Sequence, residues 1–313
     1  MGPVRLRTFY SVSLTVLLLS ILAFSWGNEG HIAVNKAAAQ HLPKDMPDFF
    51  RRATDRLAYL GPEPDRWREI SEPALKYAQE PDHFIDLERV SDLAEFPHDR
   101  YLFYRWLYQK RAAVTETPDD YLPERVGLQP YAAMETYDRL KVAFREYRRL
   151  KQEHKPTKAA EADAVFYAGW LGHYVADVAN PLHTTIHYNG WLGSNPNEYT
   201  TSKEFHWLFE GLFVSRNLRK LGFADLIQRP QVLSQPFADY ISYIRQSNGL
   251  VEHLYQIEKA HGFEEGGSPE AINFVRRRLA AGTQMLLNLW YTAWLESAKP
   301  VPPRTVEKKP VGS

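Results

Sequence analysis

Two histidine–carboxylate pairs repeat the same helical spacing in the middle of the chain. Asp177 follows His173 by four residues, and Glu210 follows His206 at the same interval. Side chains at this spacing lie on one face of a helix, so each pair can reach a single cation. His183 lies between the two pairs. Imidazole and carboxylate groups are zinc ligands, so these residues indicate more than one zinc ion, with ordinary core histidines as the alternative.

The first pair lies in the most apolar segment that we predict to be helical, residues 159–180, which Pro181 ends. A charged group in such a helix is costly to bury unless a partner or a metal compensates it. The chain contains no cysteine. Any zinc site must therefore use histidine, carboxylate and backbone groups, and stability cannot come from disulfides.

The amino-terminal segment has the pattern of a secretory signal peptide. Arg5 and Arg7 precede a mostly apolar stretch over residues 12–24, and small residues stand at Ala23 and Ser25. This pattern predicts a signal peptide over residues 1–25, with cleavage before Trp26. An uncleaved membrane anchor is the alternative, but the apolar run is short for a span. We therefore expect a secreted or periplasmic protein without a transmembrane anchor after cleavage.

Cleavage before Trp26 would create a further metal ligand. A terminal amine has a pKa near ~8 in model compounds, so it can lose its proton and bind a metal. The amine and the carbonyl oxygen of Trp26 can close a chelate ring on one ion, and His31 follows five residues later. The alternative is a tryptophan that only packs at the terminus.

Charge and composition limit the class of protein. Lys plus Arg and Asp plus Glu both number 38, and 44% of the residues are hydrophobic. This composition excludes wholesale disorder and supports a sizeable core. The equal numbers of basic and acidic residues leave no net positive charge to attract nucleic acid. A polyanionic substrate would therefore have to bind at a local site, where metal cations supply positive charge.

The apolar periodicity predicts helices throughout the chain. The expected helices cover residues 30–42, 99–113, 131–151, 159–180, 203–221, 235–261 and 269–297. In the third of these the candidate inner positions are Met134, Leu140, Val142, Phe144 and Tyr147. Residues 61–82 and 187–201 are rich in loop-forming residues and predict two long loops. We expect a monomeric, all-α protein with one multi-helix domain over residues 26–298 and a disordered tail over residues 299–313.

Several separated motifs together resemble a known superfamily. They are Trp26-Gly-x-x-Gly-His31, His83-Phe-Ile-Asp86, His173-x3-Asp177 with Asn180-Pro-Leu-His183, and His206-x3-Glu210, with Asp65 as a further carboxylate. In order and spacing they resemble the zinc-dependent single-strand-specific nucleases and the bacterial zinc-dependent phospholipases C. The resemblance runs from Trp26 to Glu210 and implies an all-α fold with long active-site loops that binds three zinc ions.

The resemblance also implies roles for individual residues. The first zinc ion would be bound by Asp65, His83, His173 and Asp177. The second would be bound by Trp26, His31 and Asp177, so that Asp177 bridges a close pair of ions. The third would be bound by His183, His206 and Glu210.

Such a zinc site implies hydrolysis of phosphoric ester bonds, because closely spaced zinc ions activate water and stabilise the charge that develops on phosphoryl oxygens. The resemblance gives catalytic roles to Asp65, Asp177 and Arg68. Arg68 would contact the phosphate, although an exposed loop arginine is an equal alternative. In the similar nucleases, the residue matching Phe84 stacks on a base and the one matching Asp86 hydrogen-bonds its edge.

The sequence features do not all favour the same class of substrate. The long gap between His183 and His206 is typical of the nucleases, whereas Glu210 in place of Asp is typical of the phospholipases. The absence of disulfides and a longer gap between Asp65 and His83 also depart from the nuclease pattern. We therefore expect a nuclease on single-stranded nucleic acid or nucleotides. The alternatives are a phospholipase C on lipid headgroups and a zinc-stabilised binding protein without turnover.

Overall fold

Helices form the framework of the protein. The computed structural model describes residues 27–301; the predicted signal peptide, Trp26 and most of the predicted disordered tail lie outside this range. Apart from an isolated bridge between Tyr188 and Gly190, the described residues contain no β-structure. The predicted all-α class is therefore confirmed.

The helices have the following bounds, with η denoting 3-10 turns and the single π-helix, η5: α1 Gly27–Gln40, α2 Asp48–Arg51, α3 Thr54–Leu60, α4 Glu63–Arg66, α5 Pro73–Gln79, η1 Glu80–His83, η2 Leu87–Val90, α6 Arg100–Ala113, η3 Pro118–Tyr121, α7 Pro123–Val126, α8 Gln129–Gln152, α9 Lys158–Asp177, η4 Pro181–Thr184, η5 Trp207–Phe213, α10 Val214–Asn217, η6 Leu218–Lys220, η7 Ala224–Leu226, α11 Pro236–Asn248, α12 Val251–Lys259 and α13 Pro269–Glu296.

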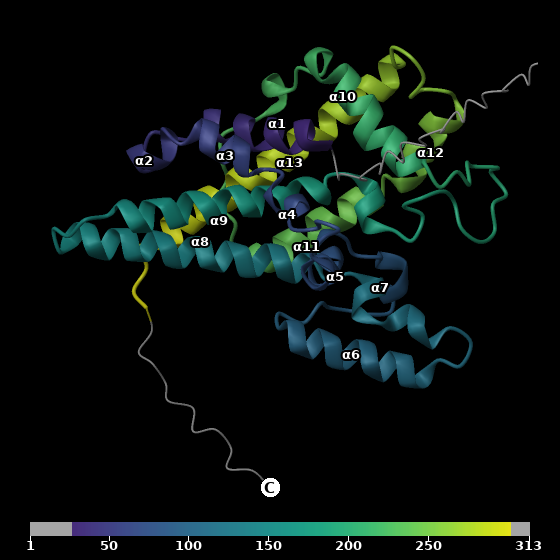
Figure 1. Ribbon diagram of the computed structural model, residues 1–313, viewed down its shortest axis with the longest axis horizontal. Helices are drawn as coiled ribbons and strands as arrows, with labels where there is room; N and C mark the ends of the chain where they lie inside the picture. Colours follow the sequence, from purple (N-terminus) through teal and green to yellow (C-terminus); the bar gives the residue numbers. More distant parts are fainter. Residues whose placement is uncertain (1–26, 302–313) are drawn as a thin grey trace, which may run out of the picture.

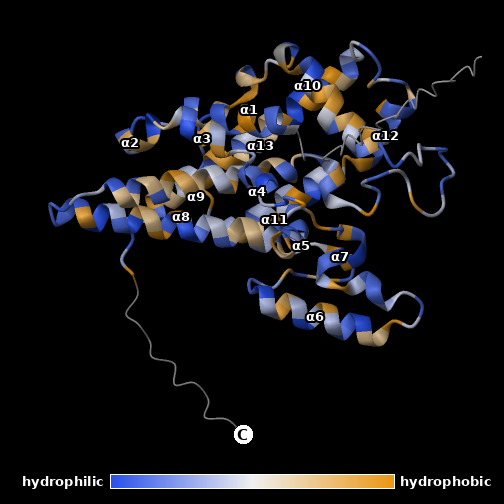
Figure 2. Ribbon diagram, in the orientation of Figure 1, coloured by the Kyte–Doolittle hydropathy of each residue, from blue (hydrophilic) through white to orange (hydrophobic). Residues whose placement is uncertain are grey.

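The two long helices α8 and α9 run antiparallel; α13 packs against both, and α1 and α3 pack against α9 (Figure 1). Large side chains such as Phe50, Tyr137, Phe144 and Trp290 are fully buried in this bundle. Hydrophobic residues recur along α9 and α13, whereas hydrophilic residues cover much of the outer side of α8 (Figure 2). The apolar helix predicted from the sequence is therefore the centre of the core. Within residues 27–301, no helix combines the length and hydropathy that a membrane span requires.

A close approach of α1 to α9 places His31 beside His173. The side-chain amide of Asn35 on α1 donates to the carbonyl oxygens of Leu57 and Gly169, at 2.9 and 3.0 Å. A Cβ atom on Gly172 would lie only 1.9 Å from the Asn35 side-chain oxygen. Glycine at this position of α9 therefore allows the contact, one residue before His173.

Side chains from three other helices fix the carboxyl-terminal end of α9. Gln129 and Tyr243 donate to the carbonyl oxygens of Tyr174 and Val175 in the last turn of α9. Arg278 and Ser247 donate to the carbonyl oxygen of Ala179, in the turn just after the helix. The last carbonyls of a helix lack partners within the helix, and the first two bonds supply partners to two of them. The turn that follows Asp177 is thus anchored from α8, α11 and α13.

Four details of the sequence-based prediction are wrong. Residues 61–82 are not a continuous loop: α4 and α5 lie there, each with a proline in its first turn, where proline is tolerated. Residues 203–221 are not one regular α-helix, because the π-helix η5 occupies Trp207–Phe213. The segment 235–261 divides at Gly249 into α11 and α12. Val142, predicted to face inward, is 58% exposed. The predicted loop over residues 187–201 contains no helix, in agreement with the expectation.

Candidate metal centre

Four predicted ligands converge at one point between α4, η1 and α9. The Nδ1 atom of His83 lies 3.0 Å from His173 Nε2 and 3.1 Å from Asp177 Oδ2. His173 Nε2 lies 3.3 Å from the same Asp177 oxygen. Asp65 Oδ1 lies 3.8 and 3.9 Å from the two histidine nitrogens. All four side chains are buried, so these donor atoms face one another in the protein interior.

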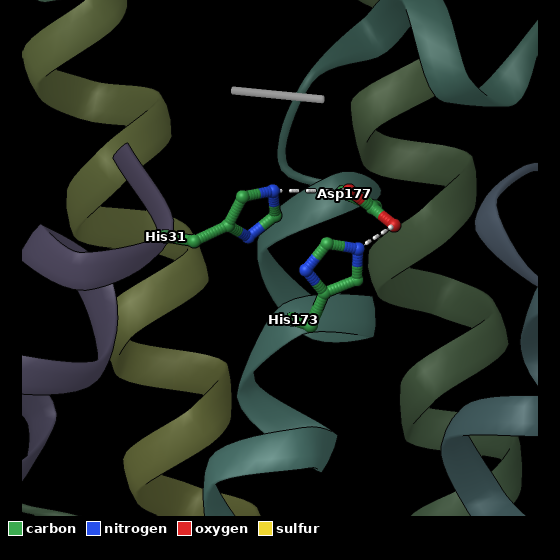
Figure 3. Close-up of side chains that lie close together, drawn as sticks. All are labelled: His31, His173 and Asp177. Carbon is green, nitrogen blue, oxygen red and sulfur yellow. Dashed lines mark ion pairs between the residues drawn. The ribbon is translucent and has the colours of Figure 1, made fainter. Parts of the chain in front are cut away.

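The second carboxylate oxygen of Asp177 faces a different histidine. Its Oδ1 atom lies 3.4 Å from Nε2 of His31. The two imidazole rings of His31 and His173 stack at a centroid distance of 4.0 Å, and each directs one nitrogen toward one oxygen of the carboxylate (Figure 3). Asp177 therefore presents one oxygen to each of two neighbouring donor sets, as expected of a bridging ligand. Trp26, the remaining predicted ligand on this side, lies outside the described residues.

A third donor set lies where η4 meets η5. Nε2 of His206 lies 3.0 Å from Glu210 Oε2 and 3.2 Å from His183 Nε2. His183 Nε2 lies 3.3 Å from the same Glu210 oxygen. Glu210 belongs to the π-helix η5 and His206 immediately precedes it. Short π-helical segments are rare in proteins and are frequently found at functional sites.

The spacing of these donor atoms fits zinc. Tetrahedral zinc with ligand distances of about 2.0–2.1 Å requires its ligand atoms to lie about 3.3 Å apart. The three edges of the His183–His206–Glu210 set measure 3.0, 3.2 and 3.3 Å. The edges among His83, His173 and Asp177 measure 3.0, 3.1 and 3.3 Å. All donors are nitrogen or carboxylate oxygen, the chemistry that zinc accepts without thiolates.

Backbone carbonyls set which histidine nitrogen is available. Nδ1 of His173 lies 2.9 Å from the carbonyl oxygen of Gly61, and Nδ1 of His183 lies 2.8 Å from that of His83. A carbonyl oxygen only accepts, so each Nδ1 must donate. In the neutral ring this leaves the lone pair on Nε2, the atom that faces the donor set. Histidine ligands of metals commonly have such a second partner.

The electrostatics of the centre couple its carboxylates to its histidines. Burial alone would raise the pKa of Asp177, but His173 and His183 outweigh burial and hold it well below its usual range. Burial alone would lower the pKa of His183, but Asp177 and Glu210 raise it to about 9. Burial raises the pKa of Asp65 to about 6. The pKa of His173 is raised as well, so a cation that binds here would displace protons from His173 and His183.

The third donor set opens onto a cavity of about 770 Å³, and the other two sets lie beneath its wall, which His83 reaches. His83, His183, His206 and Glu210 line it, together with Arg68, Phe84 and Asp86. Arg68 Nη1 lies 3.3 Å from Asp65 Oδ1, so the guanidinium group lies beside the first donor set. Phe84 is half-buried, and Asp86 is only 5% exposed. The structure thus brings every described predicted site residue to one cavity or to the buried sets beneath it.

The sequence analysis did not assign three residues that shape this centre. Asn180 donates its side-chain amide to Glu210 Oε2 at 2.7 Å. Arg89 lies in the cavity wall, with Nε 3.5 Å from Asp86 Oδ2. Gly127 has a φ of +91°, and a Cβ atom there would lie 2.0 Å from the carbonyl oxygen of Phe84. The quoted motif contained Asn180, but its spacing gave no sign of a bond to a residue thirty positions away.

Comparisons with known proteins found limited similarity. No family model matches the sequence, and no curated protein matches it. An alpha-toxin of Clostridium perfringens from avian strain SWCP has a TM-score of 0.38 at 12% identity, over 88% of this chain and 64% of the toxin chain. The alpha toxin of Clostridium absonum has a TM-score of 0.38 at 14% identity, over 87% of this chain and 66% of that chain. The chain thus spans slightly less than two thirds of the length of each toxin.

Proposed function

We propose that this protein is an exported zinc-dependent hydrolase of phosphoric ester bonds, and that its substrate is single-stranded nucleic acid or a nucleotide. One observation carries the proposal: three convergent donor sets, with interatomic spacings that suit zinc, lie at or beneath one open cavity. The set His183–His206–Glu210 supplies three protein ligands, a number that leaves a coordination position for water or substrate.

Zinc bound at these sets would lower the pKa of a water molecule and polarise a phosphoryl oxygen. The protein's own residues hold and orient the reacting groups. Asp177 directs one oxygen to each of two donor sets and keeps them close together. Arg68, held beside Asp65, directs its fixed positive charge and planar donors into the cavity, where they suit a phosphate.

Phe84 and Asp86 support a nucleotide substrate. Both line the cavity next to the ligand His83. An aromatic ring offers a stacking platform for any base. Asp86 lines the cavity beside this ring, and a carboxylate accepts hydrogen bonds from the donor groups of a base edge.

A lipid headgroup is the second candidate substrate, and one observation favours it. Tyr188 and Leu192 line the same cavity and are 47% and 41% exposed. Exposed apolar side chains in the lining of the cavity suit the glycerol and acyl part of a phospholipid better than a polynucleotide.

The test begins with elemental analysis of zinc in the mature protein from Trp26 onward. Hydrolysis of denatured DNA, RNA and phosphatidylcholine is then compared, before and after zinc removal with a chelator. Zinc-dependent hydrolysis of the nucleic acids supports the nuclease, and hydrolysis of the lipid alone supports the phospholipase. Stoichiometric zinc without hydrolysis of any substrate indicates the binding protein, and absence of zinc refutes the metal centre.

Two cavity variants sharpen the choice of substrate. Loss of base stacking costs about 1–3 kcal/mol, so Phe84→Ala is expected to lower kcat/KM on nucleic acid by roughly 5- to 150-fold. The matched change Leu192→Ala is expected to leave nucleic acid hydrolysis nearly unchanged and to weaken only lipid hydrolysis. The reverse pattern would contradict the nuclease assignment.

A further inference from the structure

Asn180 joins the two halves of the third donor set. Its side chain is completely buried, in the turn between α9 and η4. Its Oδ1 atom accepts a hydrogen bond from the backbone N–H of Leu182 at 3.0 Å and so caps η4, the turn that carries His183. Its Nδ2 atom donates to Glu210 Oε2 at 2.7 Å. One amide group therefore contacts both the turn that carries one ligand and the side chain of another.

The bond to Glu210 determines how this carboxylate lies. The oxygen that accepts from Asn180 is the same Oε2 atom that lies 3.0 Å from His206 and 3.3 Å from His183. A carboxylate oxygen has two lone-pair positions, so it can accept from Asn180 and still bind a cation. Because Glu210 is buried, rotation of its carboxylate would exchange this bond for an unsatisfied polar group.

The backbone around Asn180 is fixed from the opposite side. Arg278 and Ser247 donate to the carbonyl oxygen of Ala179 at 2.9 and 3.1 Å. The backbone N–H of Asn180 donates to the carbonyl oxygen of Asp177 at 3.0 Å. The amide of Asn180 thus extends from a rigid turn toward the π-helix that carries Glu210.

We propose that Asn180 is a positioning residue that holds Glu210 and His183 in a shared zinc-binding geometry. The proposal rests on the proposed zinc centre, and it concerns only the His183–His206–Glu210 set. Hydrogen-bonded partners of metal ligands contribute about 10- to 100-fold to metal affinity. Loss of the Asn180 bond is therefore expected to weaken one zinc site by this factor and to leave the other sites unchanged.

Two variants of Asn180 remove its hydrogen bond to Glu210 while they preserve different parts of the local structure. Asn180→Ser keeps an oxygen that can cap Leu182, because serine is a good capping residue, but its side chain is too short to reach Glu210. Asn180→Leu fills the space and prevents a water molecule from replacing the amide. Asn217→Ser is the matched control: Asn217 is 3% exposed, and its amide donates to the carbonyl oxygen of Phe213, at the end of η5, and not to a ligand side chain.

The experiment measures zinc affinities by competition with a chromophoric chelator and thermal unfolding on the same samples. We expect both Asn180 variants to bind one zinc ion about 10- to 100-fold more weakly than the wild type. We expect Asn217→Ser to lower the melting temperature without a change in zinc affinity. Wild-type affinity at every site in both Asn180 variants, or an equal loss in Asn217→Ser, overturns the inference. A wild-type protein that binds no zinc refutes the proposed function itself, so the two failures are distinguishable.

Discussion

Asp86 is a buried carboxyl group whose ionisation should oppose folding. It lies in the cavity wall beside Phe84 and is 5% exposed. Burial, together with the nearby charge of Glu88, raises the pKa of Asp86 from 3.8 to about 7, although Arg89 partly opposes the shift. The folded protein therefore retains a proton at Asp86 at pH values where the unfolded chain has lost it.

The sign of the effect follows from this difference. Below the unfolded pKa, Asp86 is protonated in both states and its ionisation does not change stability. As pH rises toward the folded pKa of about 7, the unfolded state binds fewer protons, and the free energy of unfolding falls. Between about pH 5 and about pH 8 this loss amounts to about 2–3 kcal/mol, and at higher pH it remains constant.

The perturbation is Asp86→Asn, which keeps the shape of the side chain and removes the ionisation. We expect the stability advantage of the variant over the wild type to grow by about 2 kcal/mol between about pH 5 and pH 8.5. Urea unfolding of both proteins at several pH values, at one fixed zinc concentration, measures this difference. The control is Glu124→Gln, an exposed carboxylate of the same cavity. A constant difference across the pH range, or a variant less stable at high pH, would refute the reasoning.

Three further predictions concern the centre and its surroundings. Asp177→Asn should remove zinc from two sites and Glu210→Gln from one, which elemental analysis of the purified variants can compare; equal losses would contradict the bridging role. Gly127→Ala should destabilise the protein by about 1–3 kcal/mol in urea unfolding, because its φ is +91° and its Cβ would meet the Phe84 carbonyl; an unchanged midpoint would refute the clash. A precursor blocked at cleavage should be inactive, because a peptide bond before Trp26 removes the amine ligand; full phosphodiesterase activity of this precursor would exclude that ligand.

The long helices and the main ligands were predictable from local pattern. Strong apolar periodicity and clear breakers, such as Pro181 after α9 and Pro269 at the start of α13, predicted the ends of these helices to within a few residues. Two residues four positions apart, such as His173 and Asp177, lie on the same face of any α-helix, so their proximity does not depend on the tertiary fold. Their convergence with His83 and Asp65 was expected only through the resemblance, because nothing local brings these segments together.

The irregular segments were not predictable in the same way. The composition of residues 61–82 is typical of a loop, yet α4 and α5 form there with very few fully buried side chains. A π-helix differs from an α-helix by its hydrogen-bond register and not by its apolar pattern, so η5 could not be recognised around Glu210. Val142 is a different case, because it lies two residues from Leu140 and therefore on the opposite side of α8 from buried Leu140 and Phe144. The helical period itself indicates an exposed position for Val142, so the inward prediction was a misreading of that period.

The hydrogen-bond partners that orient the ligand side chains were the least predictable part of the site. His173 donates to Gly61 across 112 positions, and His183 donates to His83 across 100. Both acceptors are backbone carbonyls, which every residue type possesses, so no residue identity could have marked them. Side-chain substitution cannot remove these carbonyls either. Asn180 differs because its bond to Glu210 comes from a side chain. Of the three contacts, only the one from Asn180 can be removed by a mutation that leaves the ligand residue unchanged. It therefore allows the effect of orienting a ligand to be measured apart from the effect of losing that ligand.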